Sequence, residues 1–158
     1  MWLTPQGQKC GPLTLMDAYS RYLLCCQNLN FKDTLHVGAV FERLFRDYGL
    51  ALRVRSDNGP PFATMATGRP PRLSINLIKA GVMPEWIGPG KPQQNGRYER
   101  MHLTMKQEGV DLSANLDLQL KTLGEFSDYY NFIRPHEALD QKSPGIFISL
   151  LRDLGMEN

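Results

Sequence analysis

Apolar positions in the first third of the chain form two short runs followed by a longer periodic segment. The runs cover residues 11–16 and 21–26, and the turn-rich tetrad Asp17-Ala18-Tyr19-Ser20 separates them. This arrangement predicts an antiparallel hairpin. Over residues 34–48 the apolar positions recur at helical spacing, and Gly49 follows as a stop signal, which predicts a helix that ends there.

The middle of the chain alternates short strands with a helix. A strand is predicted over 51–55, a helix over 73–80 and a second strand over 83–87. Residues 63–72 are rich in Gly, Pro and Thr and are interpreted as an inserted loop. A strand, a helix and a strand in this order favour an α/β arrangement around a sheet.

The last part of the chain is predominantly helical. A Gly- and Pro-rich loop at 88–92 precedes a helix that is predicted to run from residue 93 or 94 to 108. A second helical pattern covers 116–132 and ends before Pro135, because proline disfavours helical geometry in the preceding residue. A short helix is predicted over 143–154. The whole pattern predicts one layered α/β domain over residues 1–158 with a mixed sheet.

Composition narrows the class of protein. The chain has 158 residues, of which 42% are hydrophobic and 22% charged, so a folded domain with a real core is expected. Its cysteines, Cys10, Cys25 and Cys26, lack zinc-ligand spacing and are interpreted as structural thiols of a reducing compartment. No apolar run approaches membrane-spanning length and no signal-peptide pattern opens the chain, so an intracellular protein without a membrane partner is expected.

Charge is unevenly distributed although the net charge is only +2. The segment 53–106 holds nine Lys or Arg residues against three acids, which are Asp57, Glu85 and Glu99. A basic middle of this kind suits a surface that contacts phosphates. Chance variation on a solvated surface is the alternative.

Two carboxylates within this basic segment stand out. Asp57 follows the predicted strand at 51–55, and Glu99 lies one helical turn past the basic, Gly-rich loop. Carboxylates delivered by a strand end and a helix suit a divalent-metal site that faces a polyanion. The alternatives are that Asp57 only shapes a turn, and that Glu99 is an exposed residue paired with Arg100 or Lys106.

Four ordered motifs span nearly the whole chain. They are Pro12-Leu13-Thr14-Leu15-Met16-Asp17 with Ser20-Arg21-Tyr22-Leu23; Ser56-Asp57-Asn58-Gly59-Pro60-Pro61-Phe62; Gly90-Lys91-Pro92 with Asn95-Gly96-Arg97-Tyr98-Glu99-Arg100; and Tyr130-Asn131 with Arg134-Pro135-His136, Ala138-Leu139 and Ser143-Pro144. With these motifs the chain resembles the catalytic core of the retroviral-integrase superfamily, and more closely bacterial insertion-sequence transposases. A lone Asp-Asn-Gly is a common turn, so the ordered set carries the resemblance.

The resemblance implies a ribonuclease-H-like fold, in which helices flank a mixed β-sheet. Residues 1–110 would form this core and residues 111–158 a C-terminal helical extension. The family binds two Mg²⁺ or Mn²⁺ ions with three acids, Asp, Asp and Glu; Asp57 matches the second acid and Glu99 the third. Their separation is larger than usual for the family, and the loop at 63–72 accounts for the difference.

Asp17 is rejected as the first acid, because it matches a separate, turn-side position of the family pattern. Residues 1–7 resemble those just after the first acid. The first and central strand of the family's sheet, with its acid, is therefore expected to be missing from this chain.

The resemblance also implies DNA as a partner. The residues expected to face DNA are Asn58, Lys91, Asn95, Arg97, Arg100 and Lys106. Asn58 could instead accept a left-handed turn, and His102 could contact DNA or pack structurally. Packing and capping are the first interpretation of Arg134 and His136.

Three functions are compared. The first is metal-dependent DNA cleavage and strand transfer by a homo-oligomeric transposase or integrase core, acting on element ends and target DNA in the bacterial cytoplasm and associated with the nucleoid. The second is an inactive, truncated derivative that only binds DNA or self-associates. The third, a simple ribonuclease-H-type nuclease, is disfavoured because the loop at 90–92 and the motif at 95–100 match transposases.

Overall fold

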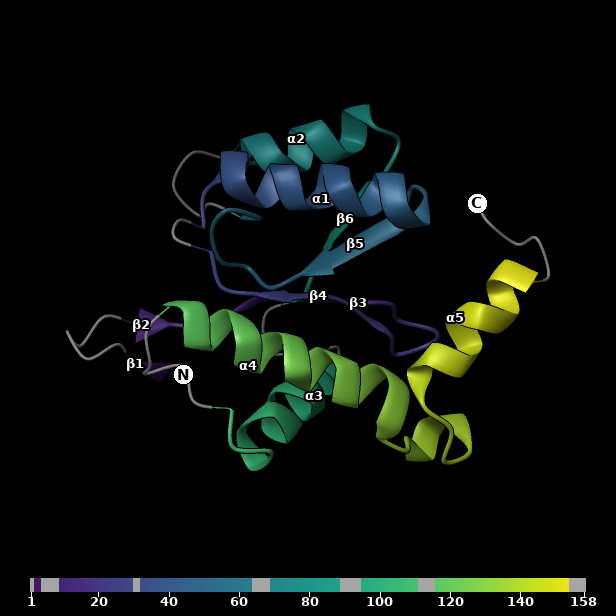
Figure 1. The fold of residues 1–158 in the computed structure, drawn as a ribbon. Coiled ribbons are helices and arrows are strands. Elements are labelled where there is room, and N and C mark those ends of the chain that lie inside the picture. The colour runs from purple at the N-terminus through teal and green to yellow at the C-terminus, as the bar shows by residue number, and fades with distance from the viewer. Residues whose placement is uncertain are drawn as a thin grey trace. The chain divides into compact units, whose positions relative to one another are not determined.

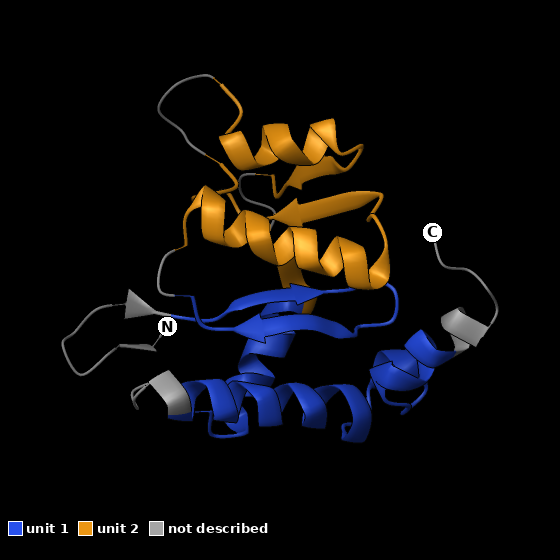
Figure 2. Cartoon of the chain, turned by 45° about the horizontal axis from the view of Figure 1, so that its top comes forward, with its two compact units in different colours: residues 1–29, 98–156 blue, residues 30–97, 157–158 orange. Residues whose placement is uncertain are grey.

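The computed structural model describes most of the chain in two compact units. The described residues are 2–3, 9–29, 32–63, 69–88, 95–110 and 116–153, with the backbone alone at 2–3, 9–10, 116–117 and 150–153. Unit 1 comprises residues 1–29 and 98–156, and unit 2 comprises 30–97 and 157–158 (Figure 2). The predicted single domain with a boundary at residue 110 stays a prediction.

Unit 1 contains two antiparallel strand pairs. β1 (Trp2–Leu3) pairs with β2 (Lys9–Cys10), and β3 (Leu13–Met16) pairs with β4 (Leu23–Gln27). The hairpin of β3 and β4 confirms the sequence prediction. Its connection holds Arg21 at φ +64°, in the left-handed region that non-glycine residues adopt infrequently.

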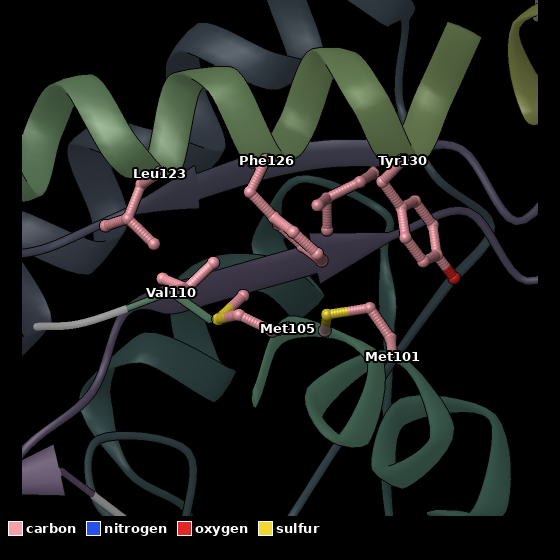
Figure 3. Close-up of a cluster of buried hydrophobic side chains, with 7 residues drawn as sticks. Met101, Met105, Val110, Leu123, Phe126 and Tyr130 are labelled. Atoms are coloured by element: carbon pink, nitrogen blue, oxygen red, sulfur yellow. The ribbon is translucent and has the colours of Figure 1, made fainter. Parts of the chain in front are cut away.

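The helices of unit 1 build its core against this hairpin. They are α3 (Gly96–Gln107), of which unit 1 takes Tyr98 onward, α4 (Leu116–Asp128), the π-helical turn η2 (Tyr129–Ile133), the 3₁₀ turn η3 (Glu137–Leu139) and α5 (Pro144–Asp153). Met101 and Met105 share one face of α3, because residues four apart in a helix are neighbours. They pack in one buried cluster with Leu123, Phe126 and Tyr130, as Figure 3 shows.

Unit 2 follows the predicted order of helix, strand, helix and strand: α1 (Thr34–Tyr48), β5 (Arg53–Ser56), α2 (Arg72–Lys79) and β6 (Met83–Trp86) (Figure 1). The Asp33 side chain caps α1 by accepting from His36 N, and Gly49 ends it at φ +82°. Both boundaries of this helix were predicted. The apolar face of α1, with Val37, Phe41 and Leu44, is buried.

The strands of the described residues form three two-stranded sheets. β5 and β6 are parallel, and they pair Arg53 with Met83 through to Ser56 with Trp86. Among the described strands no single sheet holds both parallel and antiparallel pairs, so the predicted mixed sheet stays a prediction, whereas the α/β class is confirmed. Within the described part of the chain β5 has a strand neighbour on one edge only.

Candidate functional site: a carboxylate loop and a basic helix

Asp57 lies directly after β5 and its side chain is exposed. One oxygen, Oδ1, accepts from Gly59 N at 3.2 Å, which makes a local turn. The next side chain, Asn58, donates from Nδ2 to Ile87 O at 2.9 Å. Because β5 and β6 are parallel, their carboxyl ends lie at the same edge, which is where α/β sheets bind ligands. Asn58 thus ties the segments after the two strands together at that edge.

The loop that follows Asp57 is anchored at Phe62. The carbonyl oxygen of Phe62 accepts from Ser74 Oγ at 3.0 Å and from Trp86 Nε1 at 2.9 Å. The Phe62 ring meets Phe41 edge-on, with centroids 6.1 Å apart. Contacts to α1, α2 and β6 therefore fix the loop backbone while the Asp57 carboxylate stays accessible.

Glu99 lies on α3, the predicted helix, in its first turn, and is exposed. Arg97, Arg100 and Lys106 are also exposed, whereas Met101 belongs to the buried face. The helix therefore buries its apolar residues and presents a mixed, mainly basic outer surface.

His102 has a structural environment. Thr14 Oγ1 on β3 donates to Tyr98 Oη at 2.7 Å and lies 3.2 Å from His102 Nε2. The Tyr98 and His102 rings are 4.4 Å apart between centroids. These contacts join α3 to β3, which agrees with the packing interpretation of His102.

Asp17 occupies the turn between β3 and β4. Its Oδ2 accepts from Tyr19 N at 3.1 Å, from Ser20 N at 2.6 Å and from Ser20 Oγ at 2.7 Å. Ser20 is fully buried. This carboxylate oxygen therefore organises the turn, which is a role distinct from metal binding.

The C-terminal motif closes the edge of the hairpin. The buried side chain of Asn131 accepts from Leu23 N at 2.7 Å and donates to Leu23 O at 3.0 Å. A side-chain amide thereby takes the place of a neighbouring strand on the outer edge of β4.

Arg134 and His136 pack beside this contact. Arg134 Nη1 lies 3.5 Å from Glu108 Oε1, and the His136 ring meets Tyr130 edge-on at 4.7 Å. Burial is the main factor that lowers the pKa of His136, and Arg134 and Arg21 lower it further. These contacts agree with the packing interpretation of the motif.

The structure assigns the expected site residues to different units. Asp57, Asn58, Asn95 and Arg97 belong to unit 2, and Glu99, Arg100 and Lys106 to unit 1. Lys91 lies outside the described residues. Among the described residues no three or more His, Cys, Asp and Glu side chains gather in a way that could hold a metal ion. A metal ion shared by Asp57 and Glu99 stays a prediction.

One charged group was missed at the sequence level. Arg53 and Arg55 on β5 both contact Glu85 on β6. The alternation Arg-Val-Arg in a strand would have placed both arginines on one face. The partner Glu85 could not be read from it, because the register between the two strands was unknown.

Part of this chain is similar in sequence to known proteins. Residues 80–144 match the integrase core domain. A protein of insertion element IS136 from Agrobacterium fabrum is 33% identical over 100 residues, which cover 62% of this chain and 48% of that protein. A 31.7 kDa protein of insertion element IS407 from Burkholderia multivorans is 26% identical over 143 residues, covering 89% and 50%. The chain thus spans about half the length of these curated relatives.

Solved integrase cores share the fold. The catalytic core domain of BIV integrase has a TM-score of 0.62 at 17% identity, covering 90% of this chain and 88% of that one. The HTLV-2 integrase core in complex with magnesium has a TM-score of 0.63 at 12% identity, covering 92% and 89%. The predicted resemblance and the ribonuclease-H-like, mixed α/β fold of integrase cores are confirmed. No helix in the described residues is long and apolar enough to cross a membrane.

Proposed function

We propose that this integrase core takes part in metal-dependent cleavage and strand transfer of DNA during transposition. Asp57 supplies one carboxylate and Glu99 a second. The observation that carries the proposal is the exposed Asp57, whose loop is anchored by Phe62 at the carboxyl edge of two parallel strands. The match to integrase cores and the insertion-element relatives support the same reaction class.

The donor chemistry at Asp57 fits a hard divalent cation. Its carboxylate is exposed, and among the described residues the hydrogen bond from Gly59 N leaves most of its acceptor capacity available. Mg²⁺ or Mn²⁺ prefers such oxygen ligands and, when bound, supplies activation of a hydroxyl and stabilisation of the leaving oxygen at phosphorus. The HTLV-2 core described above was solved with magnesium. Asn58 holds the Asp57 turn in place through Ile87, and Glu99 presents its carboxylate from a rigid helix.

A third acid would come from a strand that pairs with the open edge of β5. Asp17 is a poor substitute, because Oδ2 is engaged by three donors in its own turn. We propose that this strand is the central one of the family's sheet and that residues 1–158 do not include it. An unpaired strand edge readily accepts another strand. Without the third acid, two cations would be held poorly, since their mutual repulsion would be less well offset.

DNA contacts would be made to phosphates by the exposed basic residues Arg97, Arg100 and Lys106 and by Lys91, with Asn58 and Asn95 beside them. Such contacts give weak binding without strong sequence preference. We also propose that the protein assembles as a homo-oligomer, as the trimeric HTLV-2 core does, and that it works on nucleoid DNA in the bacterial cytoplasm.

A strand-cleavage assay with Mn²⁺ tests the proposal. This chain and a form carrying an additional strand with the first acid are compared on the same DNA duplex. The expected result is little or no cleavage by this chain and clear cleavage by the completed form. That cleavage is lost in Asp57→Asn and in Glu99→Gln.

Three outcomes contradict the proposal in different ways. Full activity of the completed form carrying Asp57→Asn would remove Asp57 from the site. Cleavage by the unextended chain, abolished by Asp17→Asn, would make Asp17 the first acid instead. A chain that binds DNA but never cleaves, even when completed, would favour the inactive derivative.

A further inference from the structure

The exposed face of the β5–β6 pair carries two arginines that no function described above uses. Arg53 and Arg55 are two residues apart on β5, so their side chains lie on the same face. Glu85 is the direct register partner of Arg55 on the neighbouring parallel strand β6. Figure 1 labels both strands. These three side chains form one charged cluster. Its two cations, Arg53 and Arg55, are called the arginine pair.

The geometry joins both guanidinium groups to one carboxylate. Arg53 Nη1 lies 2.9 Å from Glu85 Oε1, and Arg55 donates from Nη2 at 3.0 Å and from Nε at 3.2 Å to Oε2. The Arg53 and Arg55 side chains remain 65% and 56% exposed, against 24% for Glu85. Because each guanidinium has about five N–H donors, most of their hydrogen-bonding capacity still faces solvent.

Charge and chemistry point to an anionic ligand. Two cations share one anion, so the cluster keeps a net positive charge; hydrogen bonds from Arg53 and then Arg55 keep the pKa of Glu85 below its usual range. The planar donors of arginine recognise carboxylate and phosphate in the same bidentate way. The Glu85 carboxylate therefore occupies a position that a phosphate oxygen can take.

The location connects the cluster to the candidate site. Arg53 and Arg55 are two residues apart, and Asp57 follows at the same spacing, immediately after the end of β5. Two arginine side chains on β5 thus precede the exposed carboxylate that follows this strand. A nucleic-acid backbone that reaches Asp57 along this strand would pass them.

We propose that Arg53 and Arg55 bind backbone phosphates of the DNA that Asp57 faces, and that Glu85 competes with those phosphates for the same donors. The inference rests on the proposed function, because it takes DNA as the partner. It adds a binding site outside the basic loop and helix, together with an internal competitor that weakens binding.

DNA binding without cleavage tests this directly. Binding of the whole chain to a short fluorescent duplex is followed by anisotropy in EDTA over a series of NaCl concentrations. The variants are Arg53→Ala/Arg55→Ala and Glu85→Gln. The matched control is Arg43→Ala/Arg46→Ala, which removes the same charge from α1 of the same unit. Circular dichroism verifies that all variants are folded.

The expected results have opposite signs. Loss of the arginine pair lowers the affinity and reduces the slope of log K against log salt by up to about 2, since each lost phosphate contact removes about 0.9. Glu85→Gln raises the affinity, because the arginines lose their competitor. The α1 control changes the slope much less.

A merely structural ion pair gives a different pattern. Unchanged or weakened binding by Glu85→Gln overturns the proposal, as does a slope for the double Arg variant equal to that of the control. A wild-type chain that fails to bind at low salt overturns it as well. Loss of cleavage in Asp57→Asn is measured separately, so failure of this inference leaves the proposed reaction standing.

Discussion

Two aspartates in this chain each follow a strand and shape a turn, and their environments differ. Asp17, between β3 and β4, accepts three hydrogen bonds on one oxygen from Tyr19 and Ser20. Asp57, after β5, accepts a longer hydrogen bond from Gly59 N. The Asp17 turn lies next to a fully buried serine, whereas the side chain of Asp57 is exposed.

The difference separates a carboxylate that builds structure from one that is available for chemistry. A carboxylate with one oxygen held by three donors of its own turn stabilises that turn and is a poorer ligand for an external cation. A carboxylate on an anchored loop, with acceptor positions still available, adds little to the stability of its turn and can bind an external cation. Substituting each should therefore disturb a different measurement.

The largest effect is expected from Asp57→Asn in the cleavage-competent form. Loss of a direct metal ligand should reduce Mn²⁺-dependent cleavage by at least about a hundredfold, since even residues behind the ligands affect metal sites by roughly 10–100-fold. The free energy of unfolding should change by less than about 0.5 kcal/mol, because the side chain is exposed. Cleavage rates and urea titration measure the two quantities. Asp47→Asn on α1 is the control and should affect neither.

Asn131→Ala should give the largest loss of stability. It leaves both Leu23 N and Leu23 O without their buried partner, at a cost of roughly 2–4 kcal/mol. Urea unfolding followed by circular dichroism measures the change. Asn76→Ala, at an exposed position of α2, is the matched control with an expected change near zero. Equal effects of the two substitutions would mean that the amide does not protect the β4 edge.

Asp17→Ala should be destabilising by a smaller amount, about 1–2 kcal/mol, because it removes the acceptor for the Ser20 N–H and hydroxyl groups. Asp57→Ala serves as its counterpart and should cost much less. Thermal unfolding of both variants compares the two turns directly. A larger loss for Asp57 than for Asp17 would reverse the assignment of roles.

The smallest expected effect is a pH dependence of the unfolding free energy that comes from His136 in unit 1. Burial lowers its pKa in the folded chain, so the unfolded chain binds the extra proton more readily. The stability from this group is present above the unfolded-state pKa of about 6.5 and is lost as the pH falls from there through the lower folded-state pKa. His136→Gln should flatten the change in unfolding free energy between neutral and mildly acidic pH. An identical pH profile for wild type and variant would exclude this contribution.

Sequence patterns predicted the elements that depend on local signals. Both ends of the helix 34–48 were predicted, because the apolar spacing that defines it and the glycine that stops it are local signals in one short segment. The hairpin of β3 and β4 and the strand before Asp57 were readable for the same reason. Residue 93 or 94 was predicted as the start of the third helix, and the described part of that helix begins at Gly96.

Contacts between distant segments could not be predicted in this way. The amide of Asn131 reaches Leu23 across 108 positions, and Glu85 meets Arg53 across 32. Neither pairing is encoded in a local pattern, because each depends on strand register and helix packing. The joint site of Asp57 and Glu99 was inferred from their positions at a strand end and on a helix and from the family motifs, and it stays a prediction because the two residues belong to different units.

The contact between Asn131 and Leu23 also bears on how the chain matures during synthesis. Translation delivers the N-terminal residues first, so β4 is made long before Asn131 leaves the ribosome. Until then the outer edge of β4 lacks its amide partner, and an open strand edge is prone to pair with other chains. Contacts this distant in sequence also form slowly, because a long loop must close first. A nascent chain released before residue 131 would carry that open edge permanently, and the amide at position 131 therefore marks the point at which this half of the molecule can first become self-contained.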